Sequence, residues 1–189
     1  MRQIIDQISV EGIQAATVDV ASRRGGDTVG HATKWKVYYQ LSAEPGYGVL
    51  LAHENEDATL KEQRAKLDEE AGNFKRLRKA GFDVPDTAQH SIDVTDYLAG
   101  GVRAAALVVE HIAGPGPYKA RTEVSAIRKI VGQDETRKAL HLLAWARLSK
   151  AAQAAAPMDL QVILADDGRI VTIDPEKVGP GYSLPSLGM

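Results

Sequence analysis

The sequence contains no cysteine among its 189 residues. This absence excludes a disulfide framework, a thiolate metal site and a cysteine nucleophile. The charges also lack a dominant sign, because 23 Lys and Arg stand against 25 Asp and Glu. The net charge of −2 gives no overall basic field, so we expect neither nucleic acid nor an anionic membrane as a partner.

Long apolar runs are missing as well. No stretch is long enough to span a bilayer, and residues 1–6 (MRQIID) lack the apolar core of a secretory signal peptide. We therefore expect a protein that is soluble where it is made and that leaves a cell, if at all, by a route without a cleaved signal. The sequence does contain 44% hydrophobic and 25% charged residues, a balance typical of a globular domain or two small lobes.

The first part of the chain has mainly the pattern of strands. Residues 17–20 alternate, and residues 31–41 (HATKWKVYYQL) are rich in β-branched and aromatic types. Residues 48–53 (GVLLAH) predict a buried strand that pairs with 31–41 as a hairpin. Within this first part, a short helix at residues 10–16 is as fair an interpretation as a strand.

Residues 55–80 predict one amphipathic helix that ends at Gly81, shortly before Pro85. Its apolar face carries Leu60, Leu67, Phe74 and Leu77. Strands are then predicted at residues 91–97 and 102–112, and the second should be central because it is nearly all apolar. Residues 113–117 (AGPGP) should break any regular element.

Helices are predicted at residues 122–131 and 134–155. In the second helix, a set of leucines suits close packing against a partner element: Leu140, Leu143 and Leu148. A hairpin follows, with strands at residues 160–164 and 170–173. The chain then runs into a segment rich in Gly, Pro and Ser at residues 178–189.

Two aspartates flank this hairpin, Asp159 before its first strand and Asp174 after its second. Because a hairpin brings its two ends together, both carboxylates can lie at one site, although two solvated aspartates beside a plain hairpin are about as common. The segment resembles the catalytic segment of kinases. The resemblance implies that Asp159 positions the acceptor hydroxyl and takes its proton, while Asp174 binds the Mg²⁺ that bridges the ATP phosphates.

A second resemblance lies at residues 70–85, which look like the end of the N-lobe helix in small kinases of the aminoglycoside and choline type. There, a Glu pairs with a phosphate-binding Lys. Helix spacing favours Glu70, which lies on the apolar stripe and should face inward. Its partner should be Lys36 or Lys34 on the preceding strand, and Lys36 is preferred because it lies deeper in the apolar part.

Residues 106–114 (ALVVEHIAG) are similar to the kinase strand that leads into the hinge. The resemblance implies that backbone groups around Glu110 and Ile112 bind adenine. A loop that covers the phosphates is a weaker expectation at Gly25 and Gly26, since no Gly-x-Gly-x-x-Gly pattern is present.

The segment also departs from the kinase pattern. Leu164 occupies the position where a metal-binding Asn is expected, and Gln161 is the nearest amide that could replace it. Asp174-Pro175-Glu176 replaces the usual Asp-Phe-Gly. A non-catalytic pseudokinase or binding module therefore stays an alternative, as does a small-molecule kinase of the aminoglycoside type.

These features predict an α+β, reduced two-lobe protein-kinase-like fold in a single domain at 1–189. Residues 1–110 would form an N-lobe sheet plus one helix and the hinge strand, 111–177 a truncated helical C-lobe, and 178–189 a C-terminal tail. The chain resembles the minimal HopBF-type bacterial effector kinases. That resemblance implies a type III secreted serine/threonine protein kinase that uses ATP and Mg²⁺, enters the host cytoplasm and phosphorylates the heat-shock protein 90 chaperone.

Overall fold

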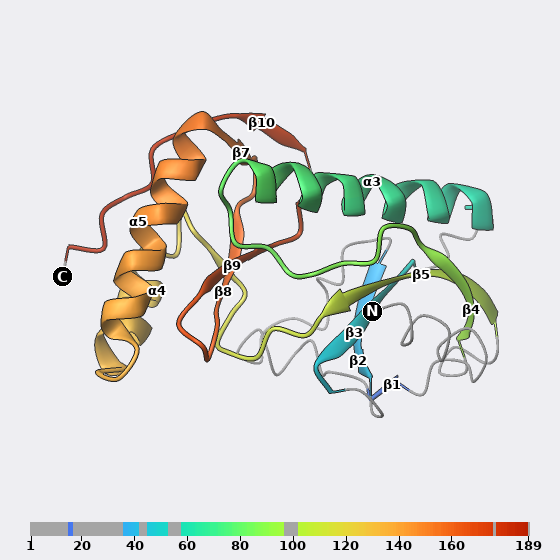
Figure 1. The fold of residues 1–189 in the computed structure, drawn as a ribbon, viewed down its shortest axis with the longest axis horizontal. Helices are drawn as coiled ribbons and strands as arrows, with labels where there is room; N and C mark the ends of the chain where they lie inside the picture. The colour runs from blue at the N-terminus through green and yellow to red at the C-terminus, as the bar shows by residue number, and fades with distance from the viewer. Residues whose placement is uncertain are drawn as a thin grey trace. The chain divides into compact units, whose positions relative to one another are not determined.

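The computed structural model describes residues 15–16, 36–41, 45–52, 58–96, 102–175 and 177–188. The described residues form a mixed α+β structure with three helices and small antiparallel sheets (Figure 1). They divide into two compact units. The first draws on residues 1–72 and 86–111, and the second on 73–85 and 112–189.

The first unit contains an antiparallel sheet with the strand order β1-β2-β3-β5-β4. Strands β2 and β3 form the predicted hairpin, in which Lys36 lies opposite Ala52. Strand β5 lies between β3 and β4, and its residues 104–109 are buried, which confirms the prediction of an internal strand. The strand bounds are Ala15–Ala16 (β1), Lys36–Leu41 (β2), Tyr47–Ala52 (β3), Ile92–Asp96 (β4) and Val102–Glu110 (β5).

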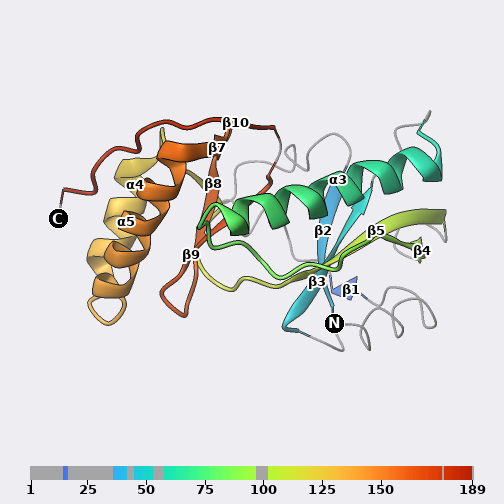
Figure 2. The same cartoon turned by 45° about the horizontal axis from the view of Figure 1, so that its top comes forward.

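Helix α3 (Leu60–Lys79) begins with a reciprocal cap. The backbone N–H of Thr59 donates to the Glu62 carboxylate over 2.7 Å, and the backbone N–H of Glu62 donates to the Thr59 hydroxyl over 3.3 Å. Leu67 packs in the same core as the sheet residues, and Figure 2 shows the first part of α3 along the sheet. The helix ends as predicted at Gly81, whose φ is 94°.

The second unit contains two helices and two further sheets. Helices α4 (Val124–Gln133) and α5 (Lys138–Ala154) lie side by side (Figures 1 and 2). One sheet has the order β6-β8-β9, and in the other β7 pairs with β10. The strand bounds are Tyr118–Lys119 (β6), Ala155–Pro157 (β7), Gln161–Leu164 (β8), Ile170–Ile173 (β9) and Val178–Pro180 (β10).

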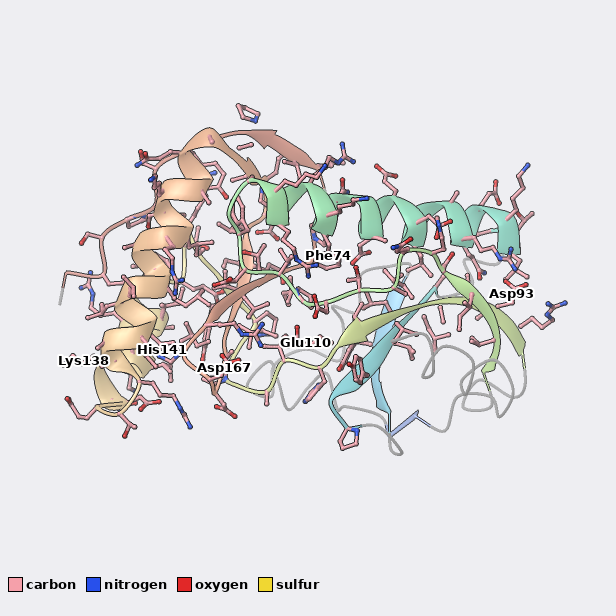
Figure 3. The ribbon with its side chains drawn as sticks, viewed as in Figure 1. Phe74, Asp93, Glu110, Lys138, His141 and Asp167 are labelled. Atoms are coloured by element: carbon pink, nitrogen blue, oxygen red, sulfur yellow. The ribbon has the colours of Figure 1, made fainter. Side chains whose placement is uncertain are left out.

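The core of the second unit gathers side chains from distant parts of the sequence. The end of α3 and the turn after it contribute Phe74 and Phe82, while α5 contributes Trp145. On α5, the buried His141 donates from Nε2 to the Ala165 carbonyl oxygen over 3.2 Å; Figure 3 labels His141 there. Residues 73–85 thus belong to the second unit, whereas the predicted boundary placed them in the first lobe.

One prediction about packing is wrong. Leu140 and Leu143 are 51% and 58% exposed, and only Leu148 of the predicted leucine set is buried. Residues 113–117 form no helix or strand, as predicted, and they run beside β8. The Leu164 backbone N–H donates to the Pro115 carbonyl oxygen over 3.0 Å, and Asp166 donates similarly to Ala113 over 2.9 Å.

The segment after β9 also packs more closely than its composition suggests. Strand β10 pairs with β7, and Leu187 is buried in the core of the second unit. The indole N–H of Trp145 donates to the Pro185 carbonyl oxygen over 3.2 Å, and the Tyr182 backbone N–H donates to Ala152 over 2.8 Å. The segment is thus part of the folded unit up to residue 188.

Across the part of the chain that the structure describes, no helix has both the length and the apolar character needed to cross a membrane.

Candidate functional site

Two strand pairings in the second unit enclose the candidate site. Within β8 and β9, Gln161 lies opposite Ile173, and within β7 and β10, Pro157 lies opposite Val178. Asp159 lies in the turn between β7 and β8, and Asp174 follows β9 directly. The strand pairings on either side therefore fix the backbone positions of both residues. The hairpin brings these two ends together, as the spacing predicts.

One side chain joins the two carboxylates. The Gln161 amide nitrogen lies 3.3 Å from Asp159 Oδ2 and 3.4 Å from Asp174 Oδ2, and it donates to both. Gln161 was predicted as a metal ligand. In the structure its NH₂ group donates to both carboxylates and so joins Asp159 to Asp174, while its role as a metal ligand stays a prediction.

Asp174 has a backbone conformation that residues other than Gly seldom adopt. Its φ is 53°, in the left-handed region. Asp and Asn tolerate this region better than other residues, but it still costs free energy, and such residues concentrate at functional sites. The conformation turns the chain sharply after β9, so that Asp174 lies beside Gln161 and not along the continued strand.

Lys119 belongs to the same cluster, and sequence reasoning missed it. Its ammonium nitrogen lies 3.2 Å from Asp159 Oδ2. Strand β6 places Lys119 directly opposite Gln161 on β8. Lys119 follows a Gly-Pro segment and has no local motif around it, so only this long-range pairing could reveal it.

Arg121 and Tyr182 border the cluster. The guanidinium of Arg121 lies over the Tyr182 ring, 4.5 Å from its centroid. Burial raises the pKa of the Tyr182 hydroxyl, the nearby Arg121 lowers this pKa, and the negative Asp159 raises it further. The hydroxyl therefore stays protonated at neutral pH, and it donates to the Pro157 carbonyl oxygen over 2.8 Å.

The donor chemistry of the cluster fits a Mg²⁺ ion bound together with phosphate. Magnesium prefers oxygen ligands and is usually held by one or two carboxylates plus substrate phosphates. Asp174 and Asp159 supply those carboxylates. The described residues contain no group of three or more His, Cys, Asp or Glu side chains that could hold a metal by themselves.

No family model matches the chain, and no curated protein matches it.

The predicted site residues on the first unit are placed only in part. Glu70 is 4% exposed, which confirms that it faces inward. Lys36 begins strand β2, but its side chain lies outside the description, so its pairing with Glu70 stays a prediction. Lys34, Gly25 and Gly26 lie outside the described residues.

The predicted adenine-binding residues lie at the end of β5. The Glu110 backbone N–H donates to the Asp86 carbonyl oxygen over 2.7 Å, and the Glu110 carboxylate accepts from the Asp86 N–H over 3.0 Å. Figure 3 labels Glu110 at this strand end. Ile112 is 4% exposed and packs with Ile163 and Val171 in the second unit. Their role with adenine stays a prediction.

Proposed function

We propose that the chain is an ATP-dependent kinase with a reduced protein-kinase-like fold. One observation carries the proposal: a single amide, that of Gln161, joins Asp159 and Asp174, which come from opposite ends of a hairpin. Phosphoryl transfer needs two carboxylates near one phosphate group, one for the metal and one for the acceptor. The strained backbone at Asp174 supports the same proposal.

The two carboxylates take different roles. Asp159, whose side chain is 56% exposed, faces water and can reach an incoming hydroxyl. It orients that hydroxyl and accepts its proton while the oxygen forms a bond to the γ-phosphorus of ATP. The bond from that phosphorus to the bridging oxygen breaks, and ADP leaves. Asp174 would hold Mg²⁺, which would supply positive charge to the phosphate oxygens.

The acceptor is proposed to be a serine of a protein. The exposed position of Asp159 supports a large acceptor, because a bulky substrate can approach an open carboxylate without entering a pocket. Heat-shock protein 90 is the first substrate to test, on the strength of the sequence resemblance alone. Delivery of the protein into a host cell rests on the same resemblance.

A labelling experiment tests the proposed function. The protein is incubated with γ-labelled ATP and Mg²⁺ in three arms: alone, with a eukaryotic lysate, and with pooled small molecules that include aminoglycosides. Label on a lysate protein supports the protein kinase, and purified heat-shock protein 90 then tests the named substrate. Label on a small molecule indicates the alternative kinase. Absence of transfer in every arm, despite nucleotide binding, indicates a pseudokinase.

A further inference from the structure

We propose that Lys119 is a phosphate-contacting residue, whose ammonium group binds an oxygen of the phosphoryl group that is transferred. The inference rests on the proposed kinase function and adds a residue that the kinase motifs in this sequence do not assign. It starts from the observation that Lys119 contacts Asp159, the proposed proton acceptor, at 3.2 Å.

The backbone around Lys119 is fixed from both sides. Tyr118 and Lys119 pair with Val162 and Gln161 of β8, and the next residue, Ala120, donates from its N–H to the Leu160 carbonyl oxygen over 2.8 Å. The Lys119 N–H donates to the Glu123 carboxylate over 2.5 Å. The Lys119 side chain starts from this fixed backbone, and its ammonium group contacts Asp159 Oδ2.

The register also determines which side chains share a face. Directly opposed residues of an antiparallel pair project from the same side of the sheet, so Lys119 and Gln161 do so. Both contact the same oxygen, Asp159 Oδ2, at 3.2 and 3.3 Å. Lys119 thus lies at the Asp159 end of the cluster, while Gln161 extends to Asp174.

Stability does not account for the ion pair. The side chains of Lys119 and Asp159 are 54% and 56% exposed, and pairs between exposed groups contribute little to stability. A phosphate group that enters between two carboxylates meets repulsion from both. Mg²⁺ would offset this charge at Asp174, and Lys119 offsets it at Asp159, where the acceptor oxygen forms its bond to phosphorus.

The test compares ligands that differ by the transferred group. Calorimetry measures the Kd of ADP and of a non-hydrolysable ATP analogue, each with Mg²⁺, for the wild type and for Lys119→Ala, Lys119→Arg and Lys129→Ala. Lys129 is an exposed lysine on α4 of the same unit and serves as the matched control. If Lys119 binds the γ-phosphate, Lys119→Ala weakens the ATP analogue roughly tenfold, as expected for one charge-assisted hydrogen bond, and leaves ADP within about twofold.

Lys119→Arg should retain most of the affinity for the ATP analogue, and Lys129→Ala should retain all of it. Equal effects of Lys119→Ala on both nucleotides, or no effect, would overturn the role of Lys119 and leave the kinase proposal intact. A wild-type protein that binds neither nucleotide would overturn both. Thermal melts of each variant establish that it folds, as the exposure of Lys119 leads us to expect.

Discussion

At the scale of single residues, the site depends on where three polar side chains are held. Gln161 donates to Asp159 and to Asp174, and all three lie near the end of one hairpin. The aspartates could be predicted from the sequence, because they flank a recognisable pair of short strands. Lys119 could not, because its contact with Asp159 depends on a pairing between segments far apart in the chain.

Asp159→Asn should reduce turnover strongly and leave ATP affinity nearly unchanged. A positioned general base contributes roughly 10²–10⁴-fold, and Asn keeps the shape while it loses the proton-accepting charge. The measurement sets the phosphotransfer rate beside the calorimetric Kd of ATP with Mg²⁺. Asp166→Asn, an exposed carboxylate in the β8–β9 turn, is the control. Wild-type turnover in Asp159→Asn would remove Asp159 from the chemistry.

Asp174→Ala should remove most of the Mg²⁺-dependent stabilisation by ATP. A ligand that binds only the folded state raises the Tm, and the metal-dependent share of this rise requires the metal ligand. The measurement is the Tm with ATP, with and without Mg²⁺, for both proteins. Equal Mg²⁺-dependent shifts would show that Asp174 does not hold the metal. Because Ala tolerates the positive φ poorly, Asp174→Asn is the second variant to measure.

At the scale of elements, the sequence pattern predicted the helices and hairpins that depend on neighbouring residues. The apolar face of α3, the hairpin of β2 and β3, and the hairpin of β8 and β9 all follow from periodicity over a few residues. Strands β6, β7 and β10 were missed, since each is two or three residues long and exists through pairing with distant segments. Leu140 and Leu143 were wrongly predicted to be packed, because a helical pattern does not indicate whether another element covers the apolar side chains.

Thr59→Ala should lower the free energy of unfolding by about 1 kcal/mol, because it removes the N-cap of α3. The effect should depend on pH. Hydrogen bonds from the Thr59 backbone N–H and hydroxyl lower the pKa of Glu62 from its ordinary value of 4.5. A carboxyl whose pKa is lower in the folded state stabilises the fold above its unfolded pKa, and this contribution is lost as the pH falls through the folded pKa.

Denaturant titrations of both proteins, at neutral pH and at several values below 4.5, measure this dependence. The difference between wild type and Thr59→Ala should narrow as the pH falls. A difference that stays constant across this range would show that the hydrogen bond from the Thr59 hydroxyl to the Glu62 carboxylate does not contribute to stability.

Gly114→Ala should destabilise the second unit by roughly 1–3 kcal/mol. Gly114 has a φ of 142°, and a Cβ there would collide with the Leu164 carbonyl oxygen of β8. The control is Gly72→Ala in α3, where a Cβ meets nothing within 4 Å and should stabilise the helix by about 0.5–1 kcal/mol. Denaturant unfolding measures both, and the same sign in the two variants would contradict the expectation for one of them.

At the scale of the whole molecule, the two units share the chain in an interleaved order. Residues 73–85 belong to the second unit but lie between the two stretches of the first. This arrangement could not be predicted, because the helix that carries residues 73–79 is continuous and its apolar stripe gives no sign of a change of core. The likeness to a kinase-like fold predicted an α+β structure correctly, and its finer claim stays a proposal.

A fragment of residues 112–189 should therefore fail to unfold cooperatively. It lacks four side chains that are buried in the core of the second unit: Phe74, Leu77, Phe82 and Val84. Loss of one buried Phe already costs about 3–5 kcal/mol, against a total stability of about 5–15 kcal/mol. Thermal melts by circular dichroism compare this fragment with residues 73–189, which keep all four. A cooperative melt of the shorter fragment at the same Tm would contradict the division.

The left-handed backbone at Asp174 has an evolutionary consequence. At a φ of 53°, Gly and Asn are accommodated at least as well as Asp, so the backbone alone would let these three residues exchange freely among descendants of one ancestor. Only Asp supplies a charged oxygen. If homologous sequences retain Asp at this position and never drift to Gly or Asn, selection acts on the carboxylate and not on the turn. Free drift would instead mean that natural selection maintains only the bend.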